Sequence, residues 1–579
     1  MTPIPNPDSW ADVITIVIVT LIVAGPTWIA ARTKRQIDDV HQHVRAVRDQ
    51  VVNGHTSPMR SDLDGMKADL TDARVALSNL RDEVRGGFAS LRADLAEERS
   101  ARRDGDISLC EEIHDRHPAV TQERTARQAG DQTLRDDLTA HRLGNMLLSA
   151  ALAALLFIWV RDTFGSLAGF VAVGALFSMP RFFFHAHLAA LDVAAAFSGF
   201  VTTFVFWKLL NRRGWAWGLL LGLVWGLALA TKINAVFIPV ILGVWTLIFR
   251  REWRVILRLV LMVLSAIPVF VAVWPWLYFN TIDRLSDYLG FITTDHWEIG
   301  QFYLGKFFMP PPWHFLFVML WAVVPLGITV MYLLGIARSV KRRPDRGIGM
   351  LFLLSALVPL LALSTGKSMV YDNDRLMMAA FPFLAALAGA GFGWLVEGLR
   401  KIVPPAKPLL FKAGVGLLLL LGFVPQLVSM VQLYPHYLSY YAESVGGLKG
   451  ANKLGLETTY WCETYRLALP IINKDAEPGD LIWADPWSHD VLVYYQVIGR
   501  LRDDVEVIAA GDTMSILGDD AGPVRYHPIS SADWFLFQHR ETALGPVGFK
   551  NTLLTFLSKQ HKVFEYTYDS IPVFTLFKK

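Results

Sequence analysis

The feature that most limits the fold is a series of long apolar segments between about residues 143 and 431. About ten of them are long enough, or nearly so, to cross a bilayer, because a membrane-spanning helix needs about 20 mainly apolar residues. Across the chain, 53% of the 579 residues are hydrophobic, 18% are charged, and the mean hydropathy is +0.35. Soluble proteins of this length are far more polar. With an N-terminal segment added, the sequence predicts a polytopic α-helical membrane protein with about eleven spans.

Basic residues recur in every second connection between these segments. They fall at Arg161, at Arg212 and Arg213, at Arg250 to Arg254, at Arg338 to Arg346, and at Arg400 to Lys412. Cytoplasmic loops are enriched in Lys and Arg, so we expect these loops inside the cell and the alternate loops outside. His, Asp, Lys and aromatic residues concentrate in the alternate loops. The net charge of +3 is too small to indicate a nucleic-acid partner.

The N-terminal part predicts an anchor at residues 1–30 and a charged coiled coil at 31–141. Apolar residues in the coil alternate spacings of three and four, which is the heptad pattern of helices that associate. This seam runs through Leu63, Met66, Leu70, Ala73, Leu77, Leu80 and Val84. It favours a homo-oligomer. The basic segment Ala31–Arg35 predicts that the coil lies inside the cell, whereas Leu143 must begin a span that is entered from outside. We give more weight to the later basic loops, because they agree with one another on the orientation of the spans.

The membrane domain is expected over residues 142–432 and a mixed α/β domain over 433–579. The second segment lacks long apolar runs, and by the same loop count it is extracytoplasmic. Its expected strands are "DLIWA", "VEVIA", "DWFLFQ" and "VFTLF", with a helix over "HDVLVYYQVIG". The cysteines Cys110 and Cys462 cannot form a disulfide framework and leave the redox compartment open.

The stretch "STGKSMVYDNDR" contains Gly-Lys-Ser, the end of a nucleotide-binding loop. That loop requires a second glycine five positions before Gly366, but Leu361 stands there. The preceding residues also form a long apolar run instead of a short strand. The segment is therefore interpreted as the edge of a membrane span, and nucleotide hydrolysis is not predicted.

Charged residues collect at the ends of spans on the predicted outer face. They are Asp192, Lys232, Lys367, Asp372, Asp374 and Arg375. Such groups beside a bilayer are costly, so they need partners or a polar cavity. The structural alternative is mutual salt bridging or snorkelling. Their convergence on one face suits an anionic lipid, with cations holding a phosphate and acids activating an acceptor or binding a metal.

Six segments together resemble bacterial family 39 glycosyltransferases, which have the GT-C fold of protein O-mannosyltransferases and lipid A aminoarabinose transferases. The segments are "HRLGNMLLSAALAALLFIWVRDTFG", "MPRFFFHAHLAALD", "GLALATKINAVFIP", "YLGKFFMPPPWHF", "VYDNDRLMMAAFPFLA" and "PHYLSYYAESVGGLKGANKLGLETTYW". The resemblance runs from about residue 141 to the C-terminus. It implies an enzyme of the bacterial plasma membrane that transfers a sugar from a polyprenyl-phosphate donor to an acceptor hydroxyl or amine at the outer face.

The resemblance also implies roles for individual residues. Asp192 matches a catalytic acid or metal-site residue, and Lys232, Lys367 and Arg375 are suited to the donor phosphate. The residues expected to line the cavity are His185, His187, His296, Trp297, Tyr303, Trp313, His314, Tyr371, Asp372 and Asp374. A divalent metal is left open. The expected partners are membrane lipid, the lipid-linked donor and a protein, lipid or glycan acceptor.

The acidic motif that the family places after its first helix is not recognisable in this chain. The coil occupies the corresponding place, where Glu111, Glu112 and Asp115 are weak candidates for the base. The stretch "VRDQVVNGHTSPMRSDLD" near the anchor instead resembles small membrane proteins of actinobacterial phages. Two accounts stay open: a fusion whose transferase lost its first helix and base, which explains both irregularities, or a divergent coil that supplies the base.

The sequence therefore predicts a membrane glycosyltransferase whose turnover is impaired if the base is missing. The alternative from another class is a non-catalytic coiled-coil membrane scaffold or a phage-derived fusion protein. A transporter is third, because the apolar pattern shows no internal repeat and the C-terminal domain is large. The donor sugar, the acceptor and the metal requirement cannot be derived from these residues.

Overall fold

The computed structural model describes residues 142–293, 300–341, 343–365, 370–484, 489–508, 529–542 and 547–579. The predicted anchor (1–30) and coiled coil (31–141) lie outside the described residues, as do Glu111, Glu112 and Asp115. So do His296 and Trp297 of the predicted cavity and Lys367, which was predicted to bind the donor phosphate.

Long apolar helices dominate the region up to residue 433. Among the described residues, six helical segments are long and apolar enough to cross a membrane, or seven if a pair bent by 117° counts as one span. The six are Arg142–Phe164, α7 (Leu191–Leu209), α10 (Trp253–Ala272), Arg346–Leu363 of α14 (Arg343–Leu363), Arg375–Ile402, which joins η3 (Arg375–Ala380) to α15 (Phe381–Ile402), and α16 (Pro408–Leu433). The bent pair is α12 (Phe315–Val323) and α13 (Leu326–Lys341). These helices make the chain a polytopic membrane protein.

Shorter helices complete this region. They are α5 (Ser166–Phe177), α6 (Pro180–His185), α8 (Ala216–Thr231), η1 (Ile233–Phe237), α9 (Ile238–Phe249), η2 (Pro275–Tyr278) and α11 (Thr281–Thr293). Three apolar segments, α5, α8 and η1 with α9, fall below the length of a full span. The expected total of about eleven spans therefore stays a prediction.

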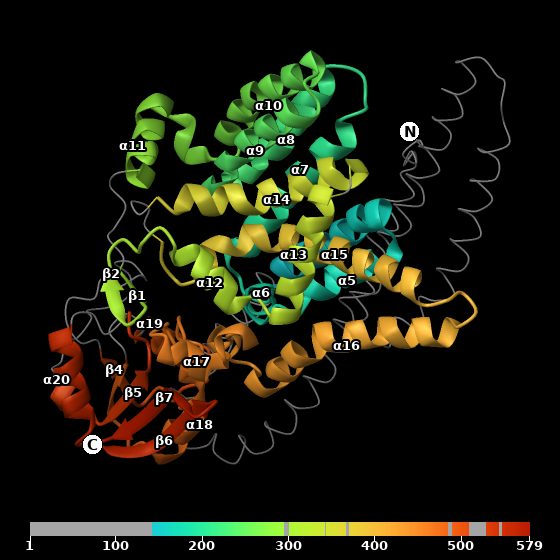
Figure 1. The fold of residues 1–579 in the computed structure, drawn as a ribbon. Helices are drawn as coiled ribbons and strands as arrows, with labels where there is room; N and C mark the ends of the chain where they lie inside the picture. The colour runs from blue at the N-terminus through green and yellow to red at the C-terminus, as the bar shows by residue number, and fades with distance from the viewer. Residues whose placement is uncertain are drawn as a thin grey trace, which may run out of the picture. The chain divides into compact units, whose positions relative to one another are not determined.

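Small residues let the membrane helices approach closely. Helix α8 lies beside α10 (Figure 1), and a Cβ added at Gly222 would stand 1.9 Å from the Ser265 Oγ of α10. Likewise a Cβ at Gly391 of α15 would stand 1.9 Å from the Met331 carbonyl oxygen of α13. Helix packing in membranes relies on such close contacts, because lipid supplies no hydrophobic force between helices. These contacts hold α8 against α10 and α15 against α13.

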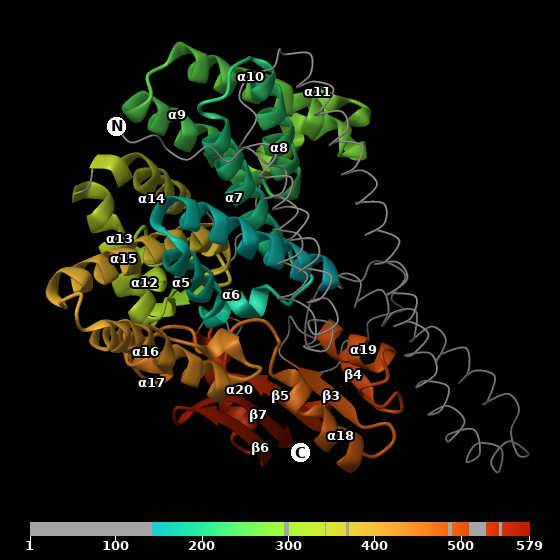
Figure 2. The same cartoon turned by 90° about the vertical axis from the view of Figure 1, so that its right-hand side faces the viewer.

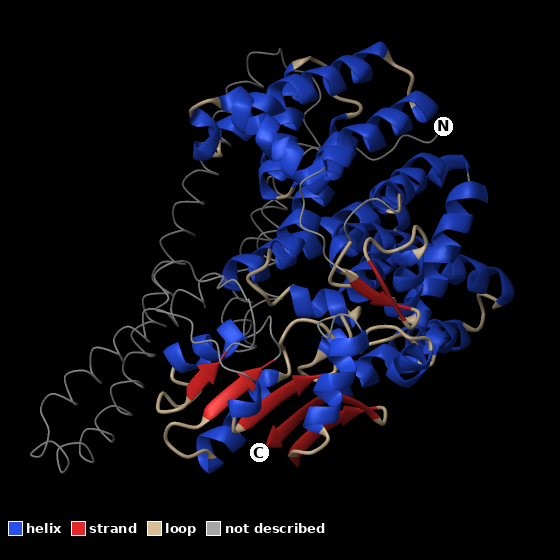
Figure 3. Cartoon of the chain, turned by 90° about the vertical axis from the view of Figure 1, so that its left-hand side faces the viewer, coloured by secondary structure: helices blue, strands red, loops and turns tan. Residues whose placement is uncertain are grey.

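The C-terminal region contains a five-stranded sheet in the order β4-β3-β5-β7-β6, drawn in red in Figure 3. Strand β3 (Leu481–Ala484) pairs in parallel with β4 (Glu506–Ile508) and β5 (Trp534–Gln538). Strand β7 (Ile571–Lys578) pairs antiparallel with β5 and β6 (His561–Tyr568), with Trp534 opposite Lys578. Strands β3, β4, β5 and β7 fall on the four segments expected as strands, whereas β6 was not expected.

Both faces of this sheet are covered by helices (Figure 2). Along β5, Trp534 and Leu536 pack in one cluster with Leu492 of α19 (His489–Val497), and α18 (Leu469–Asp475) joins the same cluster. The intervening Phe535 packs with Leu553 of α20 (Val547–Leu557). Alternate residues of a strand point to opposite faces, so β5 is buried on both sides as the central strand of the sheet.

A short hairpin from the membrane region packs on the C-terminal region. It consists of β1 (Gln301–Tyr303) and β2 (Lys306–Phe308), with Gln301 opposite Phe308. At its turn the Gly305 N–H donates to the Gly455 carbonyl at 2.9 Å. Gly455 has φ +71°, and a Cβ there would meet the Gly305 nitrogen at 2.1 Å, so this contact requires glycine. Gly455 follows α17 (Gly447–Lys453).

Candidate active site

Asp192 is the centre of the charged cluster. It lies in the first turn of α7, its side chain is 0% exposed, and the helix N-terminus favours its negative charge. The Lys232 ammonium donates to Oδ1 at 2.6 Å, and the Arg375 Nε donates to Oδ2 at 3.0 Å. Each carboxylate oxygen is therefore bound by a cation.

The two cations come from different parts of the membrane region. Lys232 follows α8 with extended backbone (φ −160°, ψ 135°), and Arg375 begins η3. Their side chains remain 19% and 27% exposed, whereas the carboxylate that binds them is sealed. The structure thus brings together Asp192, Lys232 and Arg375, three residues that the sequence placed on one face, and leaves both cations accessible.

Asp372 joins Arg375 to the C-terminal region. Its carboxylate accepts hydrogen bonds from Arg375 Nη1 at 3.2 Å, Arg540 Nη2 at 3.2 Å and the Trp461 indole at 3.0 Å. The Arg375 guanidinium also lies 5.2 Å from the centre of the Trp461 ring, within the range of a cation–π contact. Arg375 is therefore held by Asp192 on one side and by Asp372 and Trp461 on the other.

A second ion pair lies beside this cluster and is fully buried. Arg181 Nη1 and Asp374 Oδ1 are 2.5 Å apart, with side chains 1% and 0% exposed. The Tyr460 hydroxyl donates to the same oxygen at 3.3 Å, and Arg181 Nε donates to the Tyr440 carbonyl at 3.0 Å. The Arg181 guanidinium also covers the Tyr441 ring at 4.5 Å. This pair joins α6 to the loop before η3.

His185 links the two ion pairs. Its Nε2 lies 3.1 Å from the Tyr460 hydroxyl, and its Nδ1 lies 3.8 Å from Asp192 Oδ2. Burial lowers the pKa of His185 below its usual value, so the ring is neutral at neutral pH and the second contact is not an ion pair. His187 is exposed and its Nδ1 contacts the Phe183 carbonyl at 2.7 Å.

The remaining predicted cavity residues are dispersed. Tyr303 is fully buried, and its hydroxyl lies 2.8 Å from His314 Nδ1. Trp313 is 65% exposed. Tyr371 is half-buried, and burial raises its pKa, while the neighbouring Arg375 opposes that rise. Of this group, Tyr371 is the residue whose environment includes Arg375, Asp372 and Asp192.

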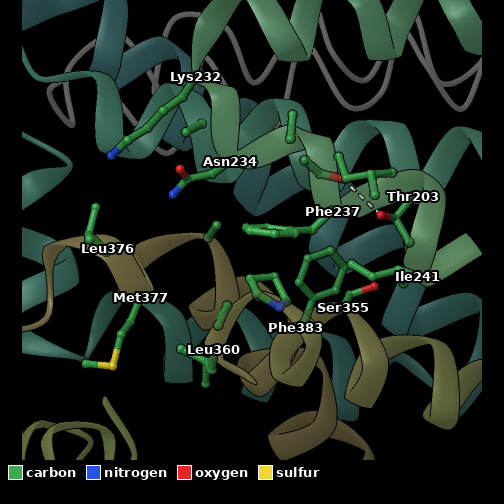
Figure 4. A pocket seen from close by; sticks show the side chains of 17 residues that line it. Thr203, Lys232, Asn234, Phe237, Ile241, Ser355, Leu360, Leu376, Met377 and Phe383 are labelled. Carbon is green, nitrogen blue, oxygen red and sulfur yellow. Dashed lines mark hydrogen bonds between the residues drawn. The ribbon is translucent and has the colours of Figure 1, made fainter. Parts of the chain in front are cut away.

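An apolar cavity of about 40 Å³ begins at Lys232 and extends between α7, η1, α14 and η3. Figure 4 shows Lys232 and Asn234 at one end, with Phe237, Ile241 and Phe383 farther in. Thr203 and Ser355 are also at its wall. This space is enough for only a few ordered waters. A larger apolar group would have to move the lining side chains.

The described residues do not fit a metal site. None of them form a group of three or more His, Cys, Asp or Glu side chains that could hold an ion. Asp192, Asp372 and Asp374 each bind a cationic side chain instead. We therefore derive no step through a metal.

Comparisons with known proteins divide the chain into two segments. Residues 132–279 match the model of the family described as dolichyl-phosphate-mannose-protein mannosyltransferase. Residues 1–111 match the model DUF2746, a protein family of unknown function. A 107-residue alignment with the Gene 30 protein of Mycobacterium phage L5 is 33% identical and covers 18% of this chain and 94% of the phage protein. The two matched segments are therefore similar to two different protein families.

Similar solved structures include ArnT and an oligosaccharyltransferase. ArnT from Cupriavidus metallidurans, bound to undecaprenyl phosphate, aligns with a TM-score of 0.40 and 17% identity over 75% of this chain and 83% of that chain. The oligosaccharyltransferase of Archaeoglobus fulgidus aligns with a TM-score of 0.34 and 11% identity over 68% of this chain and 58% of that chain. These likenesses are too distant to assign residues or substrates.

The family matches confirm both predicted resemblances, to mannosyltransferases and to a phage protein. The mannosyltransferase segment contains Asp192 and Lys232 and ends before Arg375. Residues 132–279 are thus similar in sequence to a mannosyltransferase family, and the apolar helices indicate an integral membrane protein.

Sequence reasoning missed the residues that hold Asp372 and Asp374 in this cluster. Arg181, Tyr460, Trp461 and Arg540 all contact Asp372 or Asp374. One signal for Arg181 was available: a lone arginine within "MPRFFFH" is surrounded by apolar residues and needs a buried anionic partner. Arg540 gives no comparable local signal, because it lies in a polar segment.

Proposed function

We propose that this chain is a GT-C-type membrane glycosyltransferase of the bacterial plasma membrane. It transfers a sugar from a polyprenyl-phosphate-linked donor to a hydroxyl or amine acceptor on the extracytoplasmic face. The match of residues 132–279 to a mannosyltransferase family supports the reaction class. The acceptor is a protein, lipid or glycan.

One observation carries the proposal: two partly exposed cations share one buried carboxylate beside an apolar cavity. The oxygens of a phosphate group can replace some of the contacts that these two cations make with the carboxylate. The Arg375 guanidinium would bind two phosphate oxygens as a planar fork, while the Lys232 ammonium would act as a point charge. The first part of a prenyl chain would lie among the apolar side chains next to Lys232, after these side chains move apart.

The chemistry follows from that placement. The acceptor oxygen or nitrogen forms a bond to the anomeric carbon of the sugar while the bond from that carbon to the phosphate oxygen breaks. The bonding electrons leave with the phosphate, and Lys232 and Arg375 stabilise the charge that develops there. Asp192 is a positioning residue in this scheme, because both its oxygens already hold the cations.

The proton of the acceptor must pass to a base. Asp192, Asp372 and Asp374 each accept hydrogen bonds from cations, so they are poorly suited to that role. The predicted candidates Glu111, Glu112 and Asp115 lie outside the described residues. A base from the coil, or a turnover reduced by about a hundredfold to ten-thousandfold without one, stays a prediction.

The proposed orientation agrees with the charge pattern. Asp192 lies in the first turn of α7, whose other end is followed by Arg212 and Arg213. Lys232 follows the end of α8 that is remote from those arginines. If the basic loops are cytoplasmic, the site and the C-terminal domain are extracytoplasmic.

A transfer assay tests this function. The full chain in its membrane is supplied with a panel of polyprenyl-phosphate-linked hexoses and pentoses, and the Asp192→Asn and Arg375→Ala variants are compared with wild type. We expect Arg375→Ala to lower transfer by about tenfold to hundredfold, which is the loss of a hydrogen bond to a charged group. Asp192→Asn should lower it as well.

Arg161→Ala is the matched control, because Arg161 pairs with Asp162 on the predicted cytoplasmic side and both side chains are about one-third exposed. Membrane insertion of all variants is measured in parallel. If wild type transfers the sugar and both site variants transfer it equally well, the site assignment is contradicted.

A further inference from the structure

The loop before Arg375 has a strained turn. Asp372 and Asn373 have φ values of 54° and 53°, which are left-handed for two successive residues that are not glycine. Asn and Asp tolerate this region better than other residues, but it still costs energy and persists only when neighbouring groups enforce it. The turn directly precedes Asp374 and Arg375, so its conformation sets where the Arg375 guanidinium lies.

Gln301 of β1 binds this turn at two points. Its Nε2 donates to the Asn373 side-chain oxygen at 3.2 Å, and its Oε1 accepts from the Asn373 backbone N–H at 3.3 Å. Both residues are 1% exposed. Unpaired amide groups would be costly at such burial, so the pairing favours the left-handed conformation over others.

Gln301 is itself held by the C-terminal domain. The Thr542 hydroxyl accepts from Gln301 Nε2 at 3.3 Å and from the Phe302 backbone N–H at 3.0 Å. The same hydroxyl donates to Glu457 Oε2, which also accepts the Thr542 backbone N–H at 2.8 Å. A continuous chain of hydrogen bonds therefore runs from Glu457 to Asn373.

A second connection reaches the turn through Asp372. Arg540 and Trp461 bind its carboxylate at 3.2 Å and 3.0 Å. Trp461 also has a left-handed backbone, with φ 55°. Both residues of the strained turn are thus held by groups that follow residue 433, one directly and one through Gln301.

We propose that the C-terminal domain positions the anion site of the membrane domain, with Gln301 and Thr542 fixing Asn373 and with Arg540 and Trp461 fixing Asp372. Gln301 is a positioning residue that acts through Arg375. This inference rests on the proposed function for the identity of the anion, a polyprenyl phosphate. It adds a role for the C-terminal domain and names the residues that perform it.

The first test compares two substitutions of one residue. Asn373→Gly and Asn373→Ala both delete the side-chain contact with Gln301, but glycine adopts positive φ freely and alanine does not. We expect the full-length Ala variant to bind polyprenyl phosphate in detergent about tenfold more weakly than the Gly variant. Equal affinities would show that the backbone conformation of the turn does not set the site.

The second test asks whether Gln301 acts through Arg375. Gln301→Ala should weaken polyprenyl phosphate binding by about tenfold in the wild-type background and have little effect in Arg375→Ala, because residues in one network are not additive. Gln496→Ala is the control, since the Gln496 amide also ties down a loop, at the Arg502 and Val505 carbonyls. An equal loss in both backgrounds would overturn the positioning role.

A third readout separates failure of this inference from failure of the proposed function. Amide hydrogen exchange across residues 370–376 should accelerate in Gln301→Ala and stay at the wild-type rate in Gln496→Ala. If wild type binds no polyprenyl phosphate but exchange accelerates, Gln301 fixes the turn and the proposed ligand is wrong. If exchange is unchanged, Gln301 does not position the turn, whatever the ligand.

Discussion

Asp192 and Asp374 are two buried aspartates with opposite surroundings. Both side chains are 0% exposed and both bind arginine. The partners of Asp192, Lys232 and Arg375, are 19% and 27% exposed, whereas Arg181, the partner of Asp374, is 1% exposed. An incoming anion can therefore reach Lys232 and Arg375 but not Arg181. This difference supports the proposal that the Asp192 cluster binds a ligand and that the Asp374 pair has a structural role.

The largest expected effect comes from breaking the sealed pair. Arg181→Ala leaves Asp374 buried without its cation, which typically costs about 3–5 kcal/mol of unfolding free energy. Denaturant unfolding of the full chain in mixed micelles measures this loss. Arg250→Ala, which breaks a pair exposed by 36% and 53%, should cost at most about 1 kcal/mol. Similar losses for Arg181 and Arg250 would contradict the distinction between sealed and exposed pairs.

Glu457 is a further buried carboxylate, and it lacks a direct cation contact among the hydrogen bonds and ion pairs described. Burial raises its pKa from 4.5 to about 7, against the opposing hydrogen bond from Thr542 and the charge of Arg540. Between pH 4.5 and about 7, the folded chain keeps the proton of Glu457, whereas the unfolded chain has released it. Its stabilising contribution is therefore complete below pH 4.5 and is lost as pH rises through 7, by about 3 kcal/mol.

The Glu457→Gln variant isolates this dependence. The buried histidines His436 and His539, whose pKa values burial lowers to about 4, contribute in the opposite direction, since they stabilise the fold above pH 6.5 and lose this effect as pH falls toward 4. Their contribution cancels when the unfolding free energies of wild type and Glu457→Gln are subtracted at each pH. As pH rises from 4.5 to 7, the unfolding free energy of wild type should fall relative to that of Glu457→Gln. A difference independent of pH would contradict the sealed environment of Glu457.

The sequence predicted the parts of this molecule that depend on local pattern. Apolar runs located the membrane helices, and charged residues at span ends identified Asp192, Lys232 and Arg375 as neighbours. It missed the parts that depend on contacts between distant segments. Arg181 and Asp374 are 193 positions apart, and Gln301 and Thr542 are 241 apart. No periodicity or motif links such pairs. Strand β6 was not predicted because it is an edge strand, paired with β7 alone, and its exposed polar residues interrupt the apolar pattern.

Lys232 and Arg375 are proposed to form an exchangeable anion site, and the binding of matched lipids tests this proposal. The full chain in detergent is titrated with a polyprenyl phosphate and with the polyprenyl alcohol of the same chain length. We predict that wild type prefers the phosphate by at least about tenfold, and that Lys232→Ala and Arg375→Ala each reduce this preference. Equal binding of phosphate and alcohol by wild type, or a preference that survives in both variants, would contradict the account.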